Sequence, residues 1–207
     1  MERIILPRAK DPKRVADFWT RKARSEKYPA RSVYKLKEID QKHRLIRPGF
    51  RVLDLGAAPG AWLKYTAHRV GKQGSVMGID LHHIEIDLTP NMRFTQGDIF
   101  EIETAELIEN GLFDLVLSDM APATTGVKSV DQARSVELAE TALAISQAVL
   151  KKGGALLVKI FEGPDVKGYF DDLRIVFQDV KRIKPKSSRR VSPEFFGLGQ
   201  DFRGPKD

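Results

Sequence analysis

Residues 51–60, Arg-Val-Leu-Asp-Leu-Gly-Ala-Ala-Pro-Gly, join a short apolar strand to a glycine-containing turn. Gly56 and Gly60 have no Cβ atom, so they allow a tight turn and a close approach of a ligand to the backbone. Asp54 adds a carboxylate near the end of the strand. A strand, glycine turn and helix in this order are typical of nucleotide-cofactor sites in α/β proteins. The stretch therefore predicts a cofactor site at the edge of a parallel β-sheet.

The spacing of the glycines separates two classes of cofactor. A dinucleotide fingerprint reads G-x-G-x-x-G, and its second glycine lets the backbone approach a pyrophosphate. In this chain Ala58 occupies that position. We therefore expect S-adenosylmethionine, which carries no phosphate, and an NAD-linked oxidoreductase is the disfavoured alternative.

Short apolar runs alternate with helical patterns from about residue 50 onward. This alternation predicts an α/β fold, Rossmann-like, with a largely parallel sheet and helices on both faces. The expected strands lie near residues 51–55, 75–80, 92–96, 113–118, 154–161, 179–184 and 194–198. The expected helices lie near residues 61–70, 101–109, 131–151 and 165–177. Lys151 and Lys152 fall in the last turn of the third helix, before a Gly153-Gly154 stop.

The length of 207 residues suits a single domain, residues 1–207. Residues 1–47 are expected to form a basic helical arm, with helices near residues 13–25 and 31–45. In the second helix Val33, Leu36 and Ile39 recur at a spacing that faces a core. We expect residues 48–199 to form the catalytic core and residues 200–207 a frayed tail.

Charge is distributed unevenly along the sequence. Lys and Arg outnumber Asp and Glu by 15 to 6 in residues 1–50 and by 13 to 8 in residues 151–207. Between these segments Asp and Glu lead by 14 to 7, and the formal net charge of the chain is +7. If the two basic ends meet on one face, that face attracts a phosphate backbone. RNA or DNA is therefore the expected partner.

Composition excludes several kinds of chemistry. The sequence contains no cysteine, which rules out a disulfide, a thiolate metal site and the cysteine nucleophile of carbon-5 pyrimidine methylation. The adjacent His82 and His83 lack a partner at metal-ligand spacing, and we expect no metal. No apolar run is long enough for a membrane span, and the start does not resemble a signal peptide. We expect a cytoplasmic, soluble monomer without a membrane partner.

Two further carboxylates follow the second and third expected strands. Asp80 ends the second strand, where folds of this kind hydrogen-bond a pair of ribose hydroxyls. Asp98 follows the third strand and is placed to accept a hydrogen bond from the exocyclic amine of adenine. Each has an alternative interpretation as a helix N-cap, because Asp is a preferred cap after a strand.

Asp119 follows the fourth expected strand, and Lys159 interrupts the otherwise apolar fifth. Methyltransferases that act on base amino groups carry an aromatic platform after their Asp/Asn-Pro-Pro motif, but residues 120–123 are Met-Ala-Pro-Ala. The remaining candidate acceptor of the methyl group is a ribose 2′-hydroxyl. Because this hydroxyl is a weak acid, its reaction needs a positioned base. Lys159 is the candidate for this base. Its alternative is a side chain that extends past the strand end into water, and its protonation state stays open.

Five motifs of the chain resemble the signatures of one family. They are Arg-Ser-Val-Tyr-Lys-Leu-Lys-Glu-Ile at 31–39, Asp-Leu-Gly-Ala-Ala-Pro-Gly-Ala-Trp at 54–62, Ser-Asp-Met-Ala-Pro at 118–122, Val-Lys-Ile-Phe at 158–161 and Lys-Pro-Lys-Ser-Ser-Arg at 184–189. The resemblance is to the FtsJ (RrmJ, RlmE) family of ribosomal RNA 2′-O-ribose methyltransferases, and it spans most of the chain. It implies a class I S-adenosylmethionine-dependent fold and methylation of a uridine ribose in large-subunit, 23S-type rRNA within the ribosomal subunit.

The resemblance also implies roles for individual residues. The family's Lys-Asp-Lys-Glu tetrad falls on Lys35, Asp119, Lys159 and Glu194, and Lys159 would deprotonate or orient the target 2′-hydroxyl. Together with Asp54 of the strand, the expected cofactor contacts are Gly56, Gly60, Trp62, Asp80, Asp98 and Asp119. The expected RNA contacts are Arg31, Lys35, Lys184, Lys186, Arg189 and Arg190. The basic cluster among them favours phosphate docking on its own account, because it directly precedes Glu194, and its alternative is a merely solvated face.

The chain departs from the family pattern at two places. Ala61 stands where a second glycine is expected, and Phe195-Phe196 replaces a strand that usually contains tyrosine, which leaves the position of Glu194 to be tested. Two alternative functions stay open. One is a tRNA 2′-O-ribose methyltransferase of the same superfamily, and the other is a noncatalytic RNA-binding ribosome assembly factor, against which the intact Asp119 and Lys159 argue.

Overall fold

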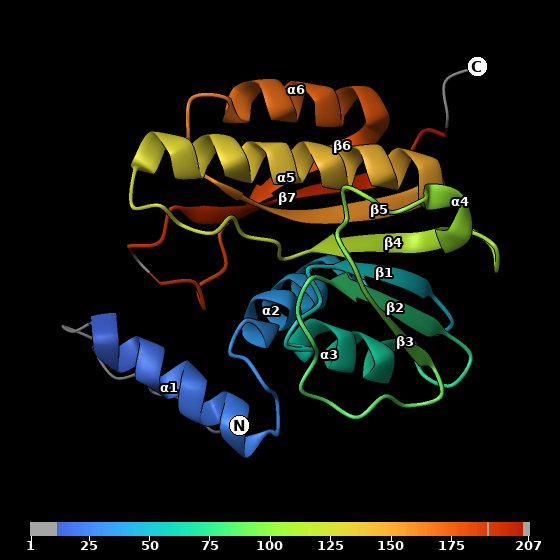
Figure 1. Ribbon diagram of the computed structural model, residues 1–207, viewed down its shortest axis with the longest axis horizontal. Coiled ribbons are helices and arrows are strands. Elements are labelled where there is room, and N and C mark those ends of the chain that lie inside the picture. The colour runs from blue at the N-terminus through green and yellow to red at the C-terminus, as the bar shows by residue number, and fades with distance from the viewer. Residues whose placement is uncertain (1–11, 190, 205–207) are drawn as a thin grey trace.

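The computed structural model describes residues 12–189 and 191–204, and in this part of the chain a seven-stranded sheet carries helices on both faces (Figure 1). In chain order the elements are α1 (Pro12–Ser25), α2 (Val33–His43), β1 (Arg51–Leu55), α3 (Ala61–Val70), β2 (Ser75–Asp80), β3 (Met92–Gln96), α4 (Thr104–Leu107), β4 (Phe113–Ser118), α5 (Lys128–Val149), β5 (Leu150–Phe161), α6 (Val166–Val176), β6 (Phe177–Ile183) and β7 (Glu194–Phe202). None of the helices in these residues is both long and apolar enough to cross a membrane. The predicted seven-stranded α/β fold is confirmed.

The strands run in the spatial order β3-β2-β1-β4-β5-β7-β6. The pairs from β3 through β5 are parallel, whereas β7 is antiparallel to both β5 and β6. Parallel strands need crossover connections, and these connections carry the helices to the two faces. Because β7 is reversed, its first residue Glu194 pairs with Phe161, the last residue of β5. The start of β7 therefore lies at the same edge of the sheet as the carboxyl ends of the parallel strands.

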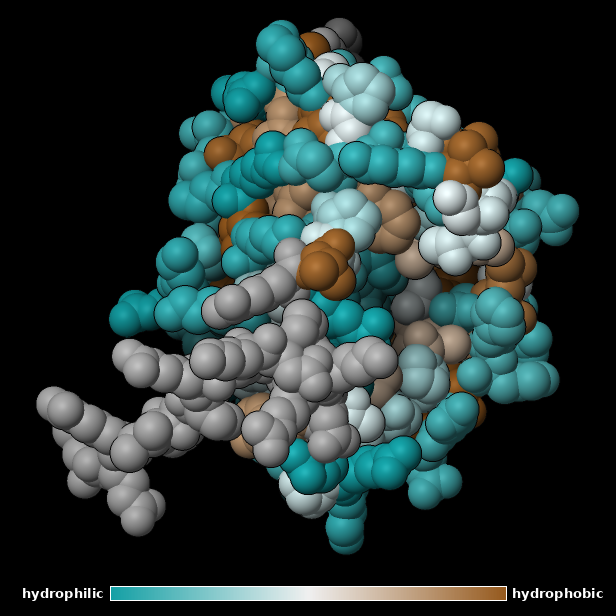
Figure 2. All heavy atoms as spheres, turned by 90° about the vertical axis from the view of Figure 1, so that its left-hand side faces the viewer, coloured by the Kyte–Doolittle hydropathy of each residue, from teal (hydrophilic) through white to brown (hydrophobic). Residues whose placement is uncertain are grey.

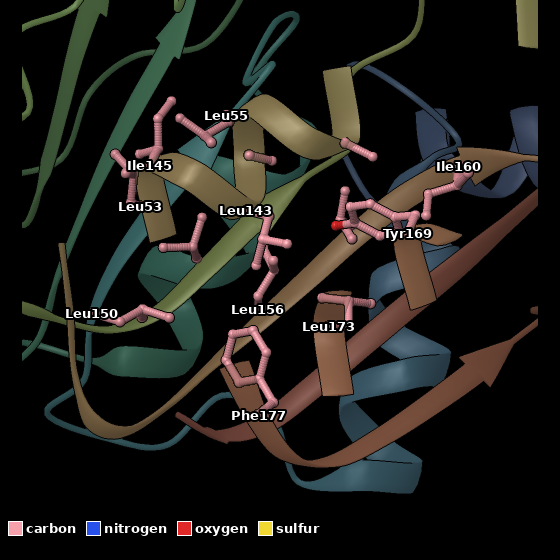
Figure 3. Packing of buried hydrophobic residues seen from close by; sticks show 14 of the residues in the cluster. Leu53, Leu55, Leu143, Ile145, Leu150, Leu156, Ile160, Tyr169, Leu173 and Phe177 are labelled. Atoms are coloured by element: carbon pink, nitrogen blue, oxygen red, sulfur yellow. The ribbon is translucent and has the colours of Figure 1, made fainter. Parts of the chain in front are cut away.

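Two hydrophobic layers hold the helices against the sheet. On one face Leu143 of α5 and Leu173 of α6 pack with Leu156 of β5 (Figure 3). On the other face α2 and α3 pack against the sheet, with Leu36 and Leu63 fully buried. Burying one such side chain contributes about 1.5–3 kcal/mol, so the helices are fixed where the strands place them.

The second helix of the expected arm is part of the folded body. Val33, Leu36 and Ile39 are buried, as their spacing predicted. Asp40 is also buried and accepts hydrogen bonds from the Tyr65 hydroxyl at 2.7 Å and from Arg69 Nε at 2.9 Å. These bonds tie α2 to α3, so the residues on the remaining face of α2 have fixed positions relative to the sheet.

The boundary between α5 and β5 differs from the expectation. The helix ends at Val149, so Lys151 and Lys152 lie in β5 and not in a last helical turn. Leu150 pairs with Phe113, and Lys151 Nζ lies 2.8 Å from Asp114 Oδ1. Contacts with β4 therefore override the local pattern that favoured a longer helix.

The C-terminal strand and the helix after β3 also differ from the expectation. The predicted frayed tail at 200–207 is wrong for its first residues, because β7 continues to Phe202. Phe202 is buried and its ring lies 5.8 Å from that of Phe177. The helix expected near residues 101–109 is reduced to the four residues of α4.

Candidate active site

The predicted functional residues gather at the carboxyl edge of the sheet. Asp54 lies in β1, whose last residue pairs with Ser118 at the end of β4, and Asp119 follows directly. Lys159 is near the end of β5, and Glu194 opens β7 at the same edge. Figure 2 views the molecule from this side, and hydrophilic residues predominate on the visible surface.

Lys159 and Asp119 form one ion pair of the site. Lys159 Nζ lies 3.0 Å from Asp119 Oδ1, and the ammonium also donates a hydrogen bond to the backbone carbonyl of Asp119. The two side chains are only 7% and 14% exposed. Adjacent strands bring them together, because Val158 of β5 pairs with Ser118 of β4. The lysine that interrupts the apolar strand is thus held at the strand end and does not extend into bulk water.

Lys35 and Glu194 form the second ion pair. Lys35 Nζ, on α2, lies 2.8 Å from Glu194 Oε1, and the two side chains are 12% and 13% exposed. Burial by itself raises the pKa of the Glu194 carboxyl, but Lys35, together with Ser188 and Lys159, outweighs burial and holds the pKa below its ordinary value. The two ion pairs therefore act on one another, and the four members of the tetrad are one cluster.

The turn after β1 leaves no room for side chains at its glycines. Gly56 has φ +77° and Gly60 has φ +103°, which are values that glycine favours. A Cβ atom on Gly56 would lie 2.6 Å from Met120 Cγ, and one on Gly60 would lie 2.7 Å from Ile86 Cγ1. The turn is therefore packed between the β4 end and the 81–89 loop and requires glycine at both positions.

Asp54 is a buried carboxyl group without a protein partner. The residue is 0% exposed, and among the described residues neither of its carboxyl oxygens has a hydrogen-bond partner. Burial raises its pKa well above the ordinary value, and the neighbouring Asp119 and Asp80 raise it further. A buried, unpaired polar group is costly, so this site suits a ligand that brings a donor or a positive charge.

Asp80 and Asp98 each support a turn at a strand end. Asp80 Oδ2 accepts a hydrogen bond from the backbone N–H of Ala58 at 2.9 Å, and Asp80 Oδ1 accepts one from His82 N at 2.8 Å. Asp98 Oδ1 accepts one from Phe100 N at 3.0 Å. Neither residue is a helix N-cap, since Gly60 caps α3 and Glu103 caps α4. The alternative interpretation as N-caps is therefore wrong.

Trp62 connects the glycine turn to α2. It is 3% exposed, and its indole N–H donates a hydrogen bond to the backbone carbonyl of Ser32 at 3.0 Å. Its ring stacks on Phe196 with 5.8 Å between centroids. Lys35 Nζ in turn lies 6.0 Å from the centre of the Phe196 ring. Trp62 thus supports the tetrad through Phe196, and its direct contact with a cofactor stays a prediction.

Three of the predicted RNA contacts, Lys184, Lys186 and Arg189, lie in the segment that precedes β7, and Lys35 belongs to the tetrad itself. Lys186 and Arg189 are exposed there, and Lys184 Nζ donates a hydrogen bond to the carbonyl of Ser192 at 2.8 Å. Arg31 is half-buried and donates to the carbonyl of Ser187 at 2.8 Å, so it also has a structural contact. Arg190 lies outside the described residues.

A large hollow lies elsewhere on the molecule. Its volume is about 1390 Å³, and its lining includes Arg51, Ser75 and Met92 at the amino ends of β1, β2 and β3. These positions are at the opposite edge of the sheet from the tetrad. The hollow therefore does not belong to the site described here.

Glu38 is a site neighbour that sequence analysis did not identify as functional. Its carboxylate accepts hydrogen bonds from the backbone N–H groups of Lys186 and Ser187. The residue is part of the motif at residues 31–39, but its partners are nearly 150 positions away and no local pattern connects them. Only the folded chain brings them together.

Comparisons with known proteins give a consistent result. The family model described as FtsJ-like methyltransferase matches residues 28–202. A protein of Oleidesulfovibrio alaskensis named ribosomal RNA large subunit methyltransferase E is 50% identical over 93% of this chain and 94% of its own length. A protein of Sorangium cellulosum with the same name is 45% identical over 94% of this chain and 92% of its own length.

Solved structures share the fold. A Plasmodium falciparum protein described as a ribosomal RNA methyltransferase has a TM-score of 0.76 and 28% identity, and the match covers 86% of this chain and all of that one. Aeropyrum pernix fibrillarin, solved with bound S-adenosyl-L-methionine, has a TM-score of 0.58 and 18% identity over 81% of this chain and 76% of its own. At 18% identity, the similarity to fibrillarin concerns the fold alone.

Proposed function

The chain belongs to the FtsJ-like methyltransferase family, and from this premise we propose that it methylates a ribose 2′-hydroxyl of large-subunit ribosomal RNA, with S-adenosyl-L-methionine as methyl donor. Family membership confirms the resemblance drawn from the five motifs. The observation that carries the proposal is the Lys159–Asp119 ion pair beside the glycine turn. The target, a uridine in 23S-type rRNA, is the one that the sequence resemblance predicts.

The residues around the turn fit this cofactor. S-adenosyl-L-methionine supplies a methyl group already activated by a sulfonium sulfur, and it carries positive charge but no phosphate. The unpaired Asp54, next to the tight turn at Gly56 and Gly60, offers an acceptor for a cationic group. Asp80 and Asp98 would accept hydrogen bonds from the ribose hydroxyls and the adenine amine. The acidic strand ends thus favour a cationic ligand over a dinucleotide.

Lys159 is the residue that would act on the target hydroxyl. Asp119 holds its amine at the strand end, which fixes the direction from which a ribose oxygen approaches. In its neutral form Lys159 accepts the hydroxyl proton, and in its charged form it orients the oxygen by a hydrogen bond. The Lys35–Glu194 pair borders the same space. Holding the reacting atoms in line in this way can lower the barrier by several kcal/mol, out of a total of about 7–11 kcal/mol available from orientation.

The choice of RNA over DNA follows from the chemistry of the acceptor. Only RNA carries a 2′-hydroxyl, and the exposed Lys186 and Arg189 flank the tetrad where a phosphate backbone would approach. Phosphate contacts of this kind set the register of a strand without reading its bases. Recognition of one nucleotide then depends on the fold of the RNA around it.

The test is to incubate the protein with methyl-labelled S-adenosyl-L-methionine and, separately, large ribosomal subunits, naked rRNA or tRNA, and to map the methylated ribose. We expect label on a 2′-oxygen of the large-subunit rRNA. Transfer to tRNA alone would favour the tRNA enzyme. RNA and cofactor binding without transfer to any of these would favour the noncatalytic assembly factor.

The matched variant is Lys159→Ala. Because Lys159 acts on the hydroxyl and not on the cofactor turn, we expect transfer to fall by about 10²–10⁴-fold while cofactor affinity is retained. Turnover comparable to that of the unaltered protein would refute the assigned role.

A further inference from the structure

The Glu38 carboxylate holds a distant segment of the chain against α2. Glu38 Oε1 accepts a hydrogen bond from Lys186 N at 2.9 Å, and Oε2 accepts one from Ser187 N at 3.2 Å. The Ser187 hydroxyl donates to the same oxygen at 3.3 Å. A carboxylate that accepts from two successive backbone N–H groups fixes both the position and the direction of the segment. We call residues 184–189 the clasped segment.

A second contact, from a residue just before α2, holds the same segment. Arg31 donates to the carbonyl of Ser187 at 2.8 Å. Ser187 and Ser188 are 3% and 6% exposed, although the segment carries several charged residues. The centre of the clasped segment is therefore seated against α2, while Lys186 and Arg189 remain exposed on either side.

The clasp lies next to the second ion pair of the tetrad. Glu38 follows Lys35 by three residues on α2, so the two side chains lie on neighbouring positions of the same helical face. The clasped segment lies five residues before Glu194 in the chain, and Glu194 is the partner of Lys35. One helix thus holds both the lysine of the pair and the segment that delivers its glutamate.

We propose that Glu38 is a positioning residue that sets the Lys35–Glu194 pair by holding the clasped segment on α2. Among the described contacts Glu38 bonds only to this segment, so it acts on the site through Glu194. The inference deepens the proposed function, because an effect of Glu38 on methyl transfer rests on that function. The effect of Glu38 on the Lys35–Glu194 pair can be tested without any substrate.

The experiment compares the variants Glu38→Ala and Glu38→Gln with the unaltered protein. Glu38→Gln keeps one oxygen that can accept from a backbone N–H, so it should rescue part of the effect. The control is Glu26→Gln, which makes the same chemical change on a carboxylate paired with Lys22 and Lys37, away from the clasped segment. Cofactor affinity, measured by calorimetry with S-adenosyl-L-methionine, reports whether each variant keeps its fold at the glycine turn.

The first readout is an NMR-detected titration of the Glu194 carboxyl, which needs no activity. In the unaltered protein and in Glu26→Gln the pKa of Glu194 stays below its ordinary value of 4.5, because Lys35 is close. In Glu38→Ala it should rise toward that value, with Glu38→Gln between the two. Amide exchange at Ser187 should quicken in the same order. An unchanged Glu194 titration in a folded Glu38→Ala protein would overturn the proposal.

The second readout is turnover on the large-subunit substrate. A displacement of about 1 Å at a catalytic group can cost about 100-fold, so we expect kcat to fall by about 10- to 100-fold in Glu38→Ala, with cofactor affinity within about twofold of the unaltered protein. A positioning role would be contradicted if kcat fell equally in Glu38→Gln and Glu38→Ala and if cofactor binding weakened as well. Such a result would indicate general damage to the fold. If the unaltered protein transfers methyl to no RNA, the proposed function fails, whereas the Glu194 titration still decides the clasp.

Discussion

Lys35 of α2 and Glu194 of β7 are joined by an ion pair with 2.8 Å between Nζ and Oε1. The pair links the basic N-terminal helices to the C-terminal strand across the carboxyl edge of the sheet. The Phe196 ring lies beside Lys35 and stacks on Trp62 next to the glycine turn. The ion pair therefore couples three parts of the chain, and its loss should be measurable in stability as well as in activity.

Glu194→Gln should lower the free energy of unfolding at pH 7 by about 1–3 kcal/mol, because it leaves the largely buried Lys35 without its charged partner. The pKa of Glu194 is lowered in the folded protein, so its contribution is present above the ordinary value of 4.5 and is lost as the pH falls through the folded value. Urea unfolding at pH 7 and near pH 3 checks this. The stability difference between the two proteins should shrink in acid, and an equal difference at both pH values would contradict the assignment.

Asp54→Asn should have the opposite dependence on pH. Burial, Asp119 and Asp80 raise the pKa of Asp54 in the folded protein, so its stabilising effect is full below the ordinary value of 3.8 and is lost as the pH rises through the folded value. The asparagine cannot titrate. Relative to the unaltered protein, Asp54→Asn should therefore gain stability as the pH rises above the ordinary value of 3.8.

The measurement for Asp54 is the urea midpoint as a function of pH for both proteins. Parallel curves would show that Asp54 does not titrate abnormally in the fold. In the same variant the affinity for S-adenosyl-L-methionine should fall, because an amide, unlike a carboxyl group, cannot ionise to pair with a cationic ligand.

Gly56→Ala should weaken both the fold and cofactor binding. The position has φ +77°, and a new Cβ atom would lie 2.6 Å from Met120 Cγ. The backbone strain alone should cost about 1–3 kcal/mol. The contact with Met120 adds to this cost and shifts the turn that lies beside Asp119.

The matched control for this variant is Gly71→Ala at the end of α3. Gly71 has φ +69°, but no atom lies within 4 Å of the place that a Cβ atom would take, so its substitution introduces backbone strain without a contact. Denaturant unfolding and calorimetric cofactor titration compare the two. We expect Gly71→Ala to lose stability only, and a cofactor affinity equally reduced in both variants would show that strain and not the turn is responsible.

Replacing Arg189 and Arg190 with alanine should weaken RNA binding and flatten its dependence on salt. Two fewer phosphate contacts should reduce the slope of log K against log[salt] by about one to two, given about 0.7–0.9 per contact. The control is Arg174→Ala, an exposed arginine on α6 that is paired with Asp171. Helix α6 covers the face of the sheet opposite α2. An unchanged slope in the double variant would show that these arginines lie outside the RNA path.

Much of the architecture was predictable because its signals are local. Apolar runs marked the seven strands, the glycines marked the turn after β1, and a lone lysine in an apolar strand marked Lys159. The boundary of α5 was predicted less well. Lys151 pairs with Asp114 of a neighbouring strand, and such a contact has no signature in the residues around Lys151.

The sequence by itself determined the strands, the helices that cover them and the chemistry available at the strand ends, because backbone preference and side-chain polarity act over a few neighbouring residues. Only the tertiary structure decided that β7 runs antiparallel, that Glu194 meets Lys35, and that Glu38 holds the clasped segment. These contacts join residues far apart in the chain, and they form only when the order and direction of the strands bring both partners to one edge of the sheet.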